Sequence, residues 1–113
     1  MVTSQIVTDE QVLTASAADV LSGTDLDQPG VPGVYTIWAV SDQVDTTISV
    51  TLGGRRVVTQ GAVVQRAGTI IEEDQDPRYQ MLSRTGGRPV IAVTEVTAAI
   101  IRVRTKFLPA FTT

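Results

Sequence analysis

The sequence predicts an all-β protein, either a single-domain antiparallel β-sandwich or a jelly-roll-like barrel, with an extended N-terminal arm. Val and Thr, which favour strands, are the commonest residues, whereas the helix-favouring Leu, Lys and Glu are scarce. In residues 46–52, Ile48, Val50 and Leu52 alternate with Thr and Ser, which is the period-two pattern of a half-buried strand. Gly53 and Gly54 then supply the positive-φ positions of a tight hairpin turn. A chain of 113 residues can bury one packed core without disulfides.

The first 18 residues are small, polar and weakly apolar, and they predict an extended arm with a short strand. Their helix propensity is poor, although a helix beginning at a capping box of Thr8 and Gln11 and ending near Gly23 is the alternative. Arms of this kind are often ordered only against a neighbouring molecule. We therefore divide the chain into an arm available for docking on a partner (1–18), a β-sandwich domain (19–109) and a C-terminal tail (110–113).

Residues 22–33 contain two Pro-Gly pairs and predict a loop, which is followed by a strand at 34–40. This strand is apolar on both faces, with Thr36 as its one polar member. Its faces carry Val34, Trp38 and Val40 on one side and Tyr35, Ile37 and Ala39 on the other. Such a strand needs a cover on each face, and we expect a second layer, the N-terminal arm or another subunit to supply it.

Short strands and turns are expected along the rest of the chain. They are a turn at 41–45, strands at 46–52 and 55–59, an ambiguous run at 61–65, a strand at 69–71, an exposed acidic loop at 72–77, strands at 79–82 and 88–94 (the latter extending as far as 97), and turns at 85–87 and 98–99.

The closing strand has one apolar face and one basic face. Ile101, Val103 and Phe107 alternate with Arg102, Arg104 and Lys106, and Pro109 ends the strand. We expect the basic stripe on the solvated or subunit-facing side of an edge strand.

The net charge of -3 is distributed unevenly. Up to Gly54 there are seven acidic residues and no base, and from Arg55 onward there are nine bases and five acids, so -7 and +4 sum to -3. One interpretation is an ordinary solvated surface. The other is that like subunits pair acidic against basic faces.

The composition excludes several kinds of chemistry. The chain has no cysteine and no histidine, so it lacks disulfides, thiolate nucleophiles and the usual general base near neutral pH. The acidic run 72–76 lacks the spacing of a calcium loop. We therefore predict no catalytic residue, no metal site and no cofactor. We also predict no nucleic-acid or membrane partner, because the chain is acidic, poor in aromatic residues and without a long apolar run.

The order of several segments resembles a known family. These segments are 19–24 (D-V-L-S-G-T), the Pro-Gly loop leading into 34–40, the hairpin at Gly53 and Gly54, the run 87–91 (G-R-P-V-I) and the closing strand 100–109. Together they resemble the small capsid decoration, or cement, proteins of tailed bacteriophages. The resemblance implies a non-enzymatic β-sandwich or jelly-roll-like domain that is made in the host cytoplasm. It would bind the major capsid protein on the outside of an icosahedral shell, as a homo-oligomer and most often a trimer, and stabilise contacts between capsomers.

Contacts of that kind favour Trp, Tyr and Arg as anchors. The predicted interface residues are Tyr35, Ile37, Trp38, Arg55, Arg56, Arg102 and Arg104. Two alternatives remain open, namely a head-tail or tail-associated β module of a virion and a small carbohydrate-binding β-sandwich that would use Trp38.

Overall fold

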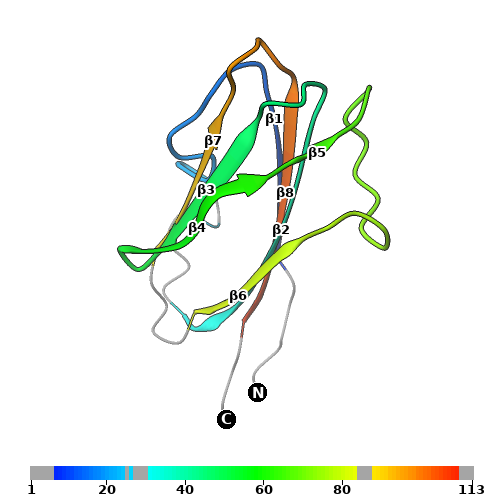
Figure 1. The fold of residues 1–113 in the computed structure, drawn as a ribbon. Helices are drawn as coiled ribbons and strands as arrows, with labels where there is room; N and C mark the ends of the chain where they lie inside the picture. The colour runs from blue at the N-terminus through cyan, green and yellow to red at the C-terminus, as the bar shows by residue number, and fades with distance from the viewer. Residues whose placement is uncertain (1–6, 25, 27–30, 84–87, 110–113) are drawn as a thin grey trace.

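The computed structural model describes residues 7–24, 26, 31–83 and 88–109 (Figure 1). This part of the chain contains eight strands and no helix, and it confirms the predicted β-sandwich. The strands are β1 (Val7–Leu13), β2 (Gly33–Ser41), β3 (Thr47–Leu52), β4 (Arg55–Ala62), β5 (Val64–Gln65), β6 (Tyr79–Ser83), β7 (Pro89–Thr94) and β8 (Ile101–Pro109). The predicted turn at 85–87, the tail at 110–113 and most of the Pro-Gly loop lie outside the described residues.

The larger sheet has β8 and β2 at its centre. β1 pairs antiparallel with β8, β8 with β2, and β2 with β6, whereas β5 adds a short parallel pair to the end of β2. β8 therefore has a strand on each side. The prediction that it is an edge strand is wrong, because β1, part of the predicted arm, lies along its outer side.

The smaller sheet has the order β4-β3-β7. Gly53 and Gly54 join β3 to β4 with φ values of 60° and 81°, which confirms the tight hairpin. The pairing of β3 with β4 shifts register twice, as at β-bulges, which bend a strand and increase its local twist. Only Val63 separates β4 from β5, and the chain crosses there from one sheet to the other (Figure 1).

The core lies between the two sheets. Alternate residues of β2, β3, β7 and β8 are buried there, among them Ile37, Ile48, Ile91 and Val103. The opposite face of β2 packs elsewhere: Trp38 and Val40 form a second small cluster with Ile71, which follows β5 in the chain. The strand at 34–40 is thus covered on both faces, and the cover for each face is supplied by the same chain.

The N-terminal segment is part of the sandwich from residue 7 onward. β1 fits the predicted short strand, and the alternative helix at Thr8 is wrong because this segment runs alongside β8 as far as Leu13. Farther on, Ala17 exchanges backbone hydrogen bonds with Val93, and the Val20 amide donates to the Ile91 carbonyl. These bonds cover the outer edge of β7.

Two further strand predictions are wrong. Residues 69–71 form no strand, because Thr69 takes a positive φ of 50° and its amide donates to the Arg66 carbonyl, which closes a turn. β7 ends at Thr94 rather than at 97, since the Thr97 hydroxyl and amide turn to donate to the Asp45 carboxylate. The described residues include no helix that is long and apolar enough to cross a membrane.

Candidate interaction surface

Two of the predicted anchors lie inside the core. Tyr35 and Ile37 are almost fully buried on the inner face of β2, where the Tyr35 ring lies 4.6 Å, centroid to centroid, from Phe107. Burial raises the pKa of the Tyr35 hydroxyl to about 12. Neither side chain is available to a partner on the folded surface, so the prediction that they anchor an interface is wrong.

Trp38 lies on the outer face of the same strand, but it is only 5% exposed. Ile71 packs against it, and the Lys106 ammonium lies 5.6 Å from the centroid of its ring. A covered indole cannot stack on a sugar. The carbohydrate-binding alternative therefore loses the residue on which it depended.

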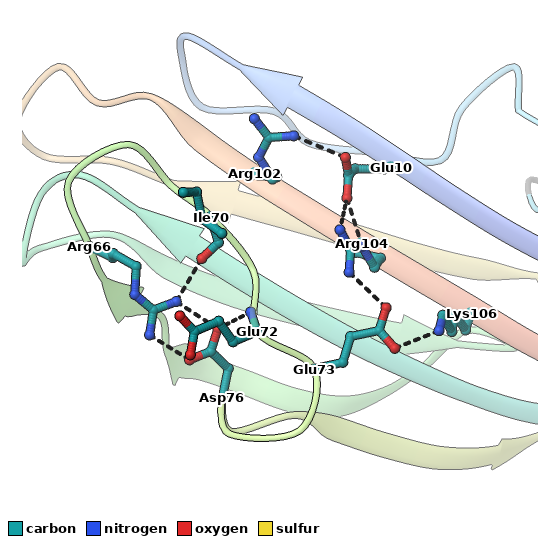
Figure 2. A network of polar contacts seen from close by, with 9 residues as sticks. All are labelled: Glu10, Arg66, Ile70, Glu72, Glu73, Asp76, Arg102, Arg104 and Lys106. Carbon is teal, nitrogen blue, oxygen red and sulfur yellow. Dashed lines mark hydrogen bonds and ion pairs between the residues drawn. The ribbon is translucent and has the colours of Figure 1, made fainter.

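Arg102 and Arg104 project from the outer face of β8 and meet Glu10 of β1 (Figure 2). Arg102 Nη1 donates to Glu10 Oε2 at 2.9 Å, and Arg104 Nε donates to Glu10 Oε1 at 2.7 Å. Arg104 Nη1 also donates to Glu73 Oε2 at 2.7 Å. The basic stripe is consequently an ion-pair ladder within one chain rather than a row of free cations.

Glu73 belongs to the segment 66–78, which joins β5 to β6 and which we call the strap. The strap crosses the outer face of the larger sheet (Figures 1 and 2). Its Glu73 carboxylate accepts hydrogen bonds from Arg104 and Lys106, and its Ile71 covers Trp38. The expected exposed acidic loop is therefore partly docked.

An internal ion pair shapes the strap. Asp76 is buried, and its two carboxylate oxygens accept hydrogen bonds from the Arg66 guanidinium at 2.7 and 2.8 Å. The Glu72 amide donates to Asp76 Oδ2, and Arg66 Nη1 also donates to the Ile70 carbonyl. One guanidinium and one carboxylate thus satisfy backbone groups at both ends of a tight bend.

The carboxylates of these pairs are more acidic than usual. The hydrogen bond from Lys106, and then that from Arg104, hold the pKa of Glu73 below its ordinary value. The bond from Arg66 does the same for the pKa of Asp76. Partial burial opposes the shift at Glu10, but the hydrogen bonds from Arg104 and Arg102 outweigh it and lower the pKa of that carboxyl group. All three groups therefore stay ionised at lower pH than ordinary carboxyl groups do.

Arg55 and Arg56 lie apart from this ladder, at the start of β4 on the edge of the smaller sheet. Both are exposed, and within the described part of the chain neither has an ion-pair partner. Val57, the next residue, is also exposed. The structure therefore brings Trp38, Arg102 and Arg104 together on one sheet and leaves the two hairpin arginines on the other.

Glu10, Glu73 and Asp76 were not predicted as partners of the basic residues. Glu10 could have been found once its segment was assigned to a strand, because in-register pairing sets it opposite Arg104. For the strap, the one signal in the sequence was Ile71, an apolar residue directly before an acidic run. The spacing of Arg66 and Asp76 in the sequence does not predict their pairing.

A hollow of about 240 Å³ opens between the strap and the β4–β5 crossing. Its lining is mainly apolar and consists of Ala39, Ala62, Val63, Val64, Pro77, Arg78 and Tyr79. The Tyr79 hydroxyl is already engaged, since it donates to the Ala62 carbonyl at 2.6 Å. Across residues 7–24, 26, 31–83 and 88–109, no group of three or more His, Cys, Asp or Glu side chains is placed to hold a metal ion.

No protein-family model matches the chain, and no curated protein sequence matches it.

Proposed function

We propose that this protein is a non-enzymatic structural component of a virion, a decoration protein that binds the major capsid protein on the outer surface of an icosahedral phage shell. In this role it acts by burying surface between neighbouring molecules, as a homo-oligomer for which a trimer is the favoured form. The proposal draws on the resemblance of its segments to capsid decoration proteins and on a surface that is free for contact.

The β3–β4 hairpin is the observation that carries the proposal. Arg55, Arg56 and Val57 are three consecutive exposed residues at the start of β4, and the two arginines have no ion-pair partner among the described residues. Arginine beside an apolar residue is the composition that protein interfaces favour. The other predicted anchors are buried or already paired with Glu10 and Glu73, so this hairpin is where we place the contact with the shell.

Binding to expanded shells of the corresponding phage that lack this protein tests the proposal. We expect the wild-type protein to sediment with the shells and the Arg56→Glu variant to bind roughly tenfold more weakly. Arg78→Glu is the matched control, because it makes the same charge change at another exposed arginine and should bind like the wild type.

Failure of the wild-type protein to add to shells would overturn the proposal. Equal losses in the two variants would also contradict it, since they would indicate a general charge effect rather than a hairpin contact. Cryo-electron microscopy of the particle then gives the location and copy number of the protein. A position at the head-tail junction or on the tail would favour the alternative role, a head-tail or tail-associated module, over shell decoration.

A further inference from the structure

The strap is held together by hydrogen bonds within its own segment. The Gln75 and Asp76 amides both donate to the Glu72 carbonyl, and the Thr69 amide donates to the Arg66 carbonyl. The Arg66–Asp76 pair then ties the two ends of the bend together. A loop whose ends are close and whose polar groups bond internally can move as one unit.

At its start the strap is joined to β2 by the Arg66 amide, which donates to the Ser41 carbonyl. Beyond that point, two kinds of side-chain contact among the described residues hold the strap on the larger sheet. One is apolar, between Ile71 and the side chains of Trp38 and Val40. The other is ionic, between the Glu73 carboxylate and the cations of Arg104 and Lys106 (Figure 2). Both cations and the carboxylate are roughly one-quarter to one-third exposed, so salt and competing anions can reach this contact.

The surface beneath Glu73 carries more positive charge than the carboxylates paired with it neutralise. Arg102, Arg104 and Lys106 carry three positive charges, which Glu10 and Glu73 only partly neutralise, on a protein of net charge -3. Beside them, the Trp38 indole nitrogen and Arg102 Nε are buried donors without a hydrogen-bond partner among the described residues. Unsatisfied buried donors are rare and favour an additional acceptor.

We propose that Glu73 occupies a carboxylate-binding site intended for a partner, and that the strap swings outward when an acidic polypeptide segment takes its place. The incoming carboxylate would accept the hydrogen bonds of Arg104 and Lys106 that Glu73 accepts now. Movement of Ile71 with the strap would then uncover Trp38 for apolar contact with the same segment. The strap thus competes within the molecule with the acidic partner for the same surface of the larger sheet.

An acidic polypeptide fits this surface better than a nucleic acid does. The site already holds a carboxylate in a two-cation clamp, whereas binding of a single nucleic-acid strand relies on several exposed aromatic side chains. Trp38 is the one tryptophan of the chain, and Tyr35 lies in the core. The inference concerns the larger sheet and stands whether or not the hairpin binds a shell.

Titration with a hexaglutamate peptide, followed by the fluorescence of Trp38, tests the inference. Glu73→Gln removes the competing charge while keeping the size of the side chain, so we expect it to bind the peptide about threefold to fivefold more tightly than the wild type. Asp74→Asn is the matched control, since Asp74 is exposed and touches neither cation, and it should bind like the wild type. Acrylamide should also quench Trp38 more efficiently in Glu73→Gln.

Two further measurements decide the outcome. Adding Lys106→Gln to Glu73→Gln should remove the gain in affinity, and circular dichroism should show that every variant keeps its sheets. Equal peptide affinities for the wild type and Glu73→Gln would overturn the inference. Preferential binding of an oligothymidylate over hexaglutamate would overturn the choice of partner.

Discussion

Arg66 and Asp76 form a bidentate ion pair in which each carboxylate oxygen accepts a hydrogen bond from the guanidinium, at 2.7 and 2.8 Å. The two residues are ten positions apart in the sequence. Asp76 has little contact with solvent, and Arg66 is about one-third exposed, so the pair lies at the boundary between the strap and water. Because the same two side chains also satisfy the Glu72 amide and the Ile70 carbonyl, this ion pair supports the bend of the strap together with its backbone hydrogen bonds.

Replacing Asp76 by Asn should therefore loosen the strap without unfolding the sandwich. The amide cannot accept two charge-assisted hydrogen bonds, and the Arg66 guanidinium loses its counter-charge. We expect faster hydrogen-deuterium exchange across residues 66–78 and unchanged protection in β2 and β8. Asp74→Asn is the control, and equal exchange in the two variants would show that the ion pair does not shape the strap.

Stability should fall in acid because of the same carboxylates. Glu10, Glu73 and Asp76 have folded-state pKa values below their ordinary ones, so the unfolded chain binds more protons than the folded chain as the pH drops. Their contribution is complete above the unfolded pKa values, about 4, and is lost as the pH falls through the lower folded values. Calorimetry should give a nearly constant Tm from about pH 7 to 5 and a decline below about pH 4, with a shallower decline for Asp76→Asn. Identical declines would assign the acid sensitivity to other groups.

The fold was readable from the sequence because its strands carry strong local signals. The alternation around Ile48 and Val50 and the glycine pair after it specify a hairpin without help from distant residues. The strand 101–107 was equally plain, but its place at the centre of a sheet was not, since a period of two fixes which face is buried and not which strands lie alongside.

The candidate surface was harder to predict for the same reason. Hydrophobicity on both faces of β2 indicated that each face needs a cover, yet it did not say whether the cover was internal. The answer depended on Ile71 and Glu73, which lie in a segment without periodicity and reach β2 and β8 only through the tertiary fold. Long-range ion pairs such as Glu10 with Arg104 depend on that fold too, whereas exposed Arg55 and Arg56 followed directly from the hairpin turn.

The two tyrosines allow an unsatisfied buried hydroxyl group to be compared with a hydrogen-bonded one. The Tyr35 hydroxyl is buried without a hydrogen-bond partner among the described residues, whereas the Tyr79 hydroxyl donates to the Ala62 carbonyl. Tyr35→Phe should leave the free energy of unfolding unchanged or raise it, because it removes an unsatisfied polar group. Tyr79→Phe should lower it by about 1 kcal/mol. Urea denaturation measures both, and a larger loss for Tyr35→Phe than for Tyr79→Phe would contradict this description of the core.

Gly61 allows β4 to approach β6 where the chain crosses between the sheets. A Cβ at this position would lie 2.5 Å from the Tyr79 hydroxyl oxygen and 2.8 Å from Cγ1 of Val58. Gly61 has no positive φ, so the constraint is a close approach rather than a backbone conformation. The Tyr79 ring is rigid and bonded to Ala62, and it cannot move aside without losing that bond.

Gly61→Ala should therefore destabilise the protein by about 1–3 kcal/mol, the usual cost of forcing extra volume into a packed site. If the clash with the tyrosine ring is the main cause, the same change should cost less in a Tyr79→Leu background, where the ring is absent. A double-mutant cycle on the free energy of unfolding measures this coupling. Additive effects of the two substitutions would show that Val58, and not Tyr79, sets the limit on side-chain size at the crossing.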